Sequence, residues 1–236
     1  MLRSLPISSR MVLYLVAVLI AALFLPSSVM AHKPIFIERS ISGYEQALEI
    51  PDATVSYAMY SELQGPQQVD LYKFTLAADT PFYARISVPK RPELRDFAPA
   101  FVLFGPGLPT SNEPPHYPLA LPEGLGRAIL LPAGEKDDFY EPFTQTTMVQ
   151  RQYISRQLPP GTYYLAVYSP AGQTGKYVLA TGEREQFGFA DWLLFPLTWL
   201  KVRLWYDATQ TWLILAGIAA AIAGAIWYWR NRNKQA

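Results

Sequence analysis

The chain has 236 residues, with 20 lysine and arginine side chains, 19 aspartate and glutamate side chains, and no cysteine. The lack of cysteine excludes disulfide-stapled domains, thiolate metal sites and cysteine nucleophiles. Five bases lie near the ends (Arg3, Arg10, Arg230, Arg232 and Lys234), and without them 15 basic side chains face 19 acidic ones. A nucleic-acid partner would need the opposite balance, so none is expected. With 50% hydrophobic residues and 21 prolines, neither disorder nor a helical bundle fits.

The first part of the chain, 1–31, predicts a signal peptide. Arginines precede an uncharged apolar stretch at 11–25, and Val29 and Ala31 are small residues at the two positions that signal peptidase recognises. Cleavage after Ala31 would make His32 the first residue. The alternative is an uncleaved anchor, but the apolar stretch is shorter than the roughly 20 residues that span a bilayer.

The segment 32–185 predicts an extracytoplasmic, all-β domain, an antiparallel β-sandwich of jelly-roll-like type. Short bursts of alternating apolar residues are separated by proline and glycine, which is typical of such sheets. In 82–88 the alternation is clean, so Phe82, Ala84, Ile86 and Val88 should face the core. The expected strands are Ala53–Leu63, Val69–Leu76, Phe82–Val88, Ala100–Phe104, Arg127–Leu131, Gln152–Arg156, Thr162–Tyr168 and Lys176–Thr181.

Two strand patterns carry a resemblance to a known family. The chain contains a D-x-Y-x-F strand at 70–74 and a terminal hairpin with G-T-Y-Y-L-x-V at 161–167 and Y-x-L at 177–179. In these it resembles the bacterial pre-peptidase C-terminal (PPC) β-sandwich. The resemblance implies the fold more than a function. Members usually accompany secreted hydrolases, and some use acidic residues to bind calcium, whereas this chain shows no peptidase and stands alone at a membrane.

The segment from 89 to 132 contains ten prolines, which cannot donate to a β-ladder. We expect an ordered loop excursion around one short strand, a place where binding surfaces are often found.

The chain has two histidines, His32 and His116. An N-terminal His32 would offer its amino and ring nitrogens to one metal, and His116 could supply a third nitrogen, a set suited to copper. In arrangement this resembles the histidine brace of periplasmic copper proteins and copper monooxygenases. The alternative is that His32 is a frayed terminal residue and His116 a loop residue packed on prolines.

The densest acidic patch consists of Glu135, Asp137, Asp138 and Glu141. Carboxylate oxygens at this density could hold calcium, although the spacing lacks the alternating pattern of a calcium loop. The alternative is a solvated acidic turn.

Aromatic residues near the last strands are candidates for a ligand groove, or else for core and cross-strand pairs. They are Tyr140, Phe143, Tyr153, Tyr163, Tyr164 and Tyr168. The sequence carries none of the common hydrolase, zinc-protease or phosphate-loop motifs, so no catalytic residue is assigned.

The C-terminal part predicts membrane association. The segment 186–210 combines tryptophans with few charges and predicts an amphipathic juxtamembrane helix in the headgroup plane, or alternatively a helix packed on the domain. Pro196 should kink or split that helix. An uncharged span at 211–229 precedes a basic tail at 230–236, which predicts a single transmembrane helix with a cytoplasmic C-terminus.

Together these patterns predict a single-pass protein of the cytoplasmic membrane with a non-catalytic ectodomain that binds or assembles. Its expected partners are the membrane and another membrane or secreted protein, or a second copy. The alternative function is periplasmic copper binding through His32 and His116, with monooxygenase-like chemistry as a minor variant. Copper and calcium are the cofactors that these residue sets suggest.

Overall fold

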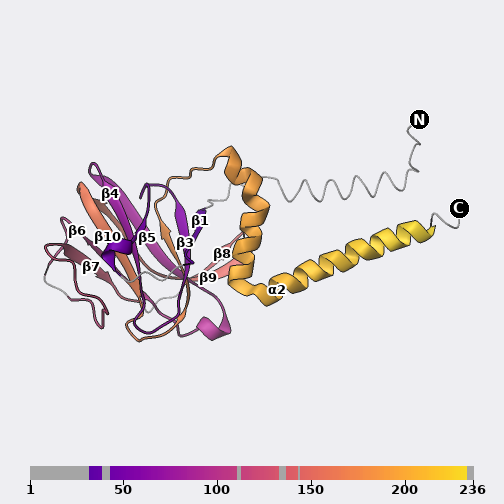
Figure 1. The fold of residues 1–236 in the computed structure, drawn as a ribbon, viewed down its shortest axis with the longest axis horizontal. Helices are drawn as coiled ribbons and strands as arrows, with labels where there is room; N and C mark the ends of the chain where they lie inside the picture. Colours follow the sequence, from indigo (N-terminus) through magenta and orange to yellow (C-terminus); the bar gives the residue numbers. More distant parts are fainter. Residues whose placement is uncertain (1–31, 39–42, 111–112, 133–136, 143, 233–236) are drawn as a thin grey trace. The chain divides into compact units, whose positions relative to one another are not determined.

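The structure is a computed structural model in which the described residues are 32–38, 43–110, 113–132, 137–142 and 144–232 (Figure 1). The predicted signal peptide at 1–31, Glu135 of the acidic patch and Phe143 lie outside these ranges.

The described residues form eleven strands, two short 3-10 helices and one long helix. The elements are β1 (Lys33–Phe36), η1 (Tyr44–Gln46), β2 (Leu48–Glu49), β3 (Tyr57–Leu63), β4 (Val69–Leu76), β5 (Thr80–Pro89), η2 (Pro92–Leu94), β6 (Ala100–Gly105), β7 (Gly126–Leu130), β8 (Asp137–Glu141), β9 (Thr146–Leu158), β10 (Gly161–Tyr168), β11 (Gly175–Thr181) and α2 (Phe189–Arg232).

The strands form two sheets, which confirms the predicted all-β sandwich. The six-stranded sheet has the order β1-β3-β11-β5-β9-β8, and the five-stranded sheet has the order β2-β4-β10-β6-β7. All eight expected strands occur, Val69–Leu76 with the expected ends and the other seven with shifted ends, but the sequence patterns missed β1, β2 and β8. Two of these missed strands pair in parallel, β1 with β3 and β2 with β4, whereas the other pairings are antiparallel.

The core lies between the two sheets. Phe82, Ala84, Ile86 and Val88 are each at most 1% exposed, so the prediction from their alternation is confirmed. Phe82 of β5 stacks on Phe74 of β4 with ring centroids 4.7 Å apart. Such offset aromatic pairs add to the stabilisation that burial of their apolar area supplies.

A polar cluster is enclosed within this core. The carboxylate of Asp70, on β4, is fully buried and accepts hydrogen bonds from the hydroxyls of Ser61 and Tyr177, both at 2.6 Å. The hydroxyls of Tyr72 and Tyr177 lie 2.8 Å apart. The D-x-Y-x-F pattern therefore has a structural explanation, because its Asp, Tyr and Phe all point between the sheets and the Asp binds donors from two other strands.

The proline-rich excursion covers the outer face of the five-stranded sheet. Between β6 and β7, Tyr117 packs against Phe104 and Tyr168, and Leu119, Leu121 and Leu125 join the same apolar cluster. The Tyr168 hydroxyl donates to the carbonyl of Pro115 at 3.0 Å. This face of the sandwich is thus sealed by the chain's own loop.

Helix α2 consists of two arms joined at Asp207, which has non-helical backbone angles (φ −154°, ψ 94°). We call residues 189–206 the first arm and residues 208–232 the second arm. The helix is not split at Pro196, as one form of the prediction expected, because it runs through that residue. By length and composition α2 can cross a membrane, and the span predicted at 211–229 lies in its second arm.

Candidate functional site

The first arm packs on the outer face of the six-stranded sheet. The indole of Trp205 meets the ring of Tyr60, on β3, edge to face with centroids 4.9 Å apart. Trp205 and Tyr206 join a small apolar cluster with Ala58, Met148 and Val178 of that sheet. The first arm therefore packs on the domain, which is one of the two placements predicted from the sequence.

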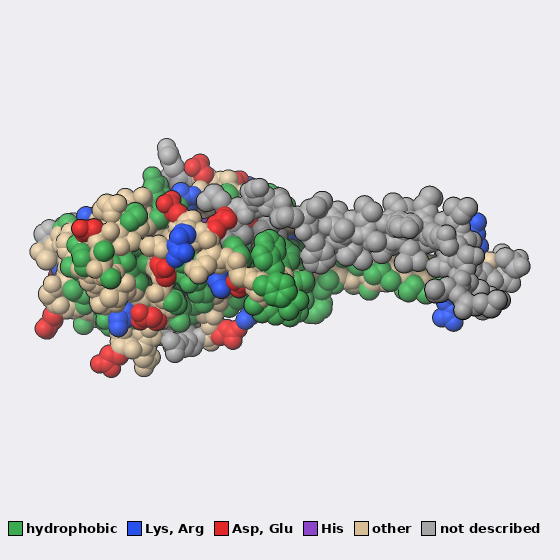
Figure 2. Space-filling model, turned by 90° about the horizontal axis from the view of Figure 1, so that it is seen from above, with side chains coloured by type: hydrophobic (Ala, Val, Ile, Leu, Met, Phe, Trp, Pro, Cys, Tyr) green, Lys and Arg blue, Asp and Glu red, His purple; other side chains and the backbone are tan. Residues whose placement is uncertain are grey.

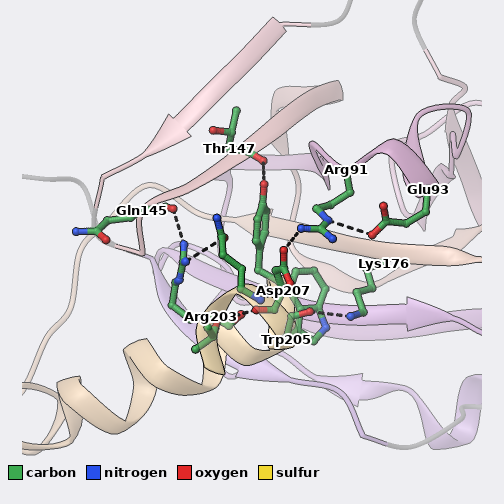
Figure 3. Close-up of polar contacts among 11 residues, drawn as sticks. Arg91, Glu93, Gln145, Thr147, Lys176, Arg203, Trp205 and Asp207 are labelled. Carbon is green, nitrogen blue, oxygen red and sulfur yellow. Dashed lines mark hydrogen bonds and ion pairs between the residues drawn. The ribbon is translucent and has the colours of Figure 1, made fainter. Parts of the chain in front are cut away.

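Side chains at the end of the first arm bind the sheet through polar contacts (Figure 3). Arg203 donates to the carbonyl of Gln145 at 2.7 Å, and the Tyr206 hydroxyl donates to the carbonyl of Thr147 at 2.9 Å. From β11, the Lys176 ammonium donates to the carbonyl of Trp205 at 2.8 Å. The last turn of the arm is thereby held by β11 and by the start of β9.

Asp207 explains why the helix breaks where it does. Its carboxylate accepts the backbone N–H of Gln210 at 2.9 Å, so it is the N-cap of the second arm. The same carboxylate pairs with Arg91, which also pairs with Glu93 at 3.0 Å (Figure 3). The buried Thr211 hydroxyl donates to the carbonyls of Arg203, at 3.0 Å, and Asp207, at 2.7 Å. The unsatisfied backbone groups at this break thus find partners, and the membrane helix is joined to the sandwich there.

Ion pairs near the start and in the second half of the first arm also join it to the sandwich. Lys33 of β1 pairs with Asp191 at 3.1 Å, and Lys201 pairs with Glu38 at 2.8 Å. Lys201 also lies over the ring of Phe36, 4.5 Å from its centroid. Exposed ion pairs contribute little singly, so these contacts orient the arm while the packed end near Trp205 supplies most of the stabilisation.

The described part of the acidic patch is a strand rather than a turn. Asp137, Asp138 and Glu141 lie in β8, at the edge of the six-stranded sheet, and neighbouring side chains of a strand point to opposite faces. Asp138 pairs with Lys90, and Glu141 accepts the backbone N–H of Thr144 at 2.6 Å. Within the described ranges no three metal-ligating side chains are grouped for a cation. The calcium site, which included Glu135, stays a prediction.

The sandwich exposes large apolar side chains at this same edge. Leu131, which follows β7, Phe139 and Tyr140 of β8, and Tyr153 of β9 are 40–57% exposed, and they are the exposed large hydrophobic residues among the described part of the sandwich. The amide of Gln152 donates to the carbonyl of Leu130 at 3.1 Å, so β9 bridges the two sheets here. We call β8 and these four residues the β8 edge.

The two histidines lie on different sheets. The His32 Nδ1 is 2.5 Å from the Ser56 hydroxyl, just before β1 and β3 of the six-stranded sheet. His116 is exposed, with a positive φ of 54°, in the loop that covers the five-stranded sheet. The structure does not bring them together, and copper binding stays a prediction.

Burial lowers the pKa of His32 below its usual 6.5, with Glu185 opposing this and Arg85 adding to it. The imidazolium is thus disfavoured in the folded chain. Burial of the neutral His32 ring contributes fully to folding above about pH 6.5, and this contribution is lost as the pH falls below that value toward the folded pKa. NMR titration of the two histidines should show His32 titrating below 6.5, and still lower in Glu185→Gln. A His32 pKa raised by Glu185→Gln would contradict this.

The candidate aromatic residues divide between core and surface. Tyr163 and Tyr168 are fully buried, and Tyr164 packs edge to face on Tyr44. Tyr153 is exposed, and the guanidinium of Arg85 lies 5.2 Å from its ring centroid. Among the described residues, only Tyr140 and Tyr153 at the β8 edge therefore remain candidates for the expected ligand groove.

The sequence patterns missed the residues that join the two arms of α2 to each other and to the sandwich. Asp207 followed by Gln210 nevertheless fits the capping pattern that starts a helix.

Comparisons with known proteins find similarity among solved structures only. No protein-family model and no curated protein matches the sequence. Among solved structures, the pre-peptidase C-terminal domain of collagenase from Bacillus anthracis is similar at 16% identity with a TM-score of 0.34, covering 59% of this chain and 97% of that domain. The assignment of two packed sheets followed by an apolar helix therefore rests on the strand pairing and on α2.

Proposed function

We propose that this chain is a single-span membrane protein whose sandwich, outside the cytoplasm, binds an extended basic segment of a membrane or secreted partner protein without catalysing a reaction itself. The β8 edge is the observation that carries the proposal. An edge strand presents backbone N–H and C=O groups to which a further strand can pair. Here the edge also offers exposed Phe139 and Tyr140 for side-chain contacts.

The charges of β8 favour a partner protein over a second copy. Three of its five side chains are acidic, Asp137, Asp138 and Glu141, and none is basic. Two copies of β8 paired edge to edge would oppose like charges, which destabilises a sheet. A segment rich in lysine or arginine would instead find complementary charge at this edge, above all at Asp137, because Asp138 pairs with Lys90 and Glu141 accepts from Thr144.

The location in this proposal rests on the two ends of the chain. Bases follow the apolar part of α2 at Arg230 and Arg232, and basic residues beside a span mark its cytoplasmic side. The apolar N-terminal stretch at 11–25 behind two arginines supports export of the sandwich.

Photocrosslinking in intact membranes tests the binding edge. A photoreactive residue at Tyr140 should capture one protein, and the same residue at Thr75, exposed on the five-stranded sheet, should not. Adding Asp137→Lys should reduce capture at Tyr140 several-fold, because it opposes a basic segment. No capture, equal capture at Thr75, no effect of Asp137→Lys, or capture of a second copy would each overturn the proposal.

A further inference from the structure

The first arm of α2 has two faces of different character. Residues spaced three or four apart lie on one side of a helix. Asp191, Val202 and Trp205 share the docked face, where Asp191 pairs with Lys33, Val202 is 2% exposed and Trp205 packs on Tyr60. The sandwich therefore fixes which side of the arm faces outward.

The outward face is apolar along the whole arm. Its members follow helical spacing and include no charged or polar side chain: Phe189, Leu193, Leu197, Leu200 and Leu204. Phe189, Leu193 and Leu197 are 85%, 71% and 65% exposed, whereas Leu200 and Leu204, nearer the end of the arm, are half-buried. We call these five residues the leucine face. Hydrophobic side chains gather on the surface where the arm lies (Figure 2).

The neighbourhood of the leucine face indicates what covers it. Asp207 directly follows the arm, and the apolar, uncharged part of the second arm begins at Thr211. Only a few residues thus separate the arm from a segment able to cross a bilayer. The arm also carries Trp192, which is 53% exposed, and Trp199, and tryptophan suits the interfacial layer of a bilayer.

The composition of the leucine face favours lipid over another helix. It has no small residue that would let a second helix approach closely, and no polar side chain that would fix a register. Acyl chains need neither feature.

We infer that the leucine face lies in the outer boundary of the lipid bilayer, between headgroups and acyl chains, so that the first arm is bound by the sandwich on one side and by lipid on the other. The six-stranded sheet then faces the membrane surface through the arm. This inference does not depend on the β8 edge, and either could fail alone.

Spin labels test it directly, because the chain has no cysteine and single cysteines can be placed freely. The full chain would be reconstituted in vesicles of phosphatidylcholine and phosphatidylglycerol, with a nitroxide at Leu193 or at Leu197. Ile218 in the second arm and Gln157 on β9 serve as lipid and water references, since both are exposed on the protein.

Collision of the nitroxides with oxygen and with a water-soluble nickel chelate gives the result. Labels at Leu193 and Leu197 should resemble the Ile218 label, with high oxygen and low nickel accessibility, at a shallower depth. Nickel accessibility equal to that at Gln157 would overturn the inference. Low accessibility to both reagents would also overturn it, because protein would then cover the face, and spin–spin broadening would identify that protein as a second copy.

Discussion

Replacing Asp70 with alanine is expected to lower the free energy of unfolding of the sandwich by about 3 kcal/mol. The carboxylate is fully buried and accepts hydrogen bonds from Ser61 and Tyr177. Its loss leaves two buried hydroxyl donors without that acceptor, which costs their desolvation without a compensating hydrogen bond. The effect should reach the whole domain, because these residues join β4 of one sheet to β3 and β11 of the other.

Thermal unfolding followed by far-UV circular dichroism measures this change. For a domain of this size, a loss of 3 kcal/mol lowers the Tm by roughly 6–12 °C. Gln68→Ala is the matched control, because the half-buried Gln68 donates to the other carboxylate oxygen of Asp70 and to the carbonyl of Glu62, and its loss leaves the bonds of Ser61 and Tyr177 to Asp70 in place. A Tm change for Asp70→Ala no larger than for Gln68→Ala would contradict the structure.

Replacing Gly105 with alanine should destabilise the domain by a similar amount, about 3 kcal/mol, through overpacking. A Cβ at this position in β6 would lie 2.1 Å from a ring carbon of Tyr163. That ring has little freedom to move, because it is fully buried, stacks on Phe74 at 5.2 Å and donates to the carbonyl of Pro159 at 2.7 Å.

Two further variants isolate the steric cause at Gly105. Gly65→Ala adds the same methyl group where no atom lies within 4 Å, so its Tm should stay close to that of the parent chain. In a Tyr163→Ala background, Gly105→Ala should cost much less, because the colliding ring is gone. Equal costs with and without the Tyr163 ring would refute steric overlap as the cause.

The central strands could be predicted from sequence because apolar and polar side chains alternate along them. Alternation in 82–88 assigned the buried face of β5 correctly. By contrast, β8 has three acidic residues in five, a composition that local propensity assigns to turns. It is a strand because it pairs with the long β9, an interaction that no local pattern reveals.

The buried polar cluster around Asp70 also could not be predicted, because it depends on contacts between residues far apart in the sequence. The D-x-Y-x-F pattern predicted a strand at 70–74, but Asp70 would be expected to face solvent. Its buried position depends on Tyr177, which is 107 positions away in the chain. A carboxylate of this kind becomes recognisable only when its donors are known.

The long helix is interrupted at Asp207 rather than at Pro196. Proline lacks the N–H that a helix interior uses, so Pro196 was expected to kink or split the helix. Asp207 breaks it instead, because its carboxylate caps the second arm and pairs with Arg91. The placement of the first arm against the six-stranded sheet depends on Tyr60 and Lys176, which sequence spacing does not connect to Trp205.

The central claim is that the sandwich and the first arm of α2 form one docked unit at the membrane. The most direct test is the distance distribution between nitroxides at Gln157 on β9 and Ala190 in the first arm, measured by pulsed electron resonance on the full chain in vesicles. Both positions are exposed, and neither takes part in the contacts described above between the first arm and the sandwich. A docked arm should give a single narrow distribution that broadens in Asp207→Ala. A broad distribution in the parent chain, as a flexible tether would produce, would contradict it.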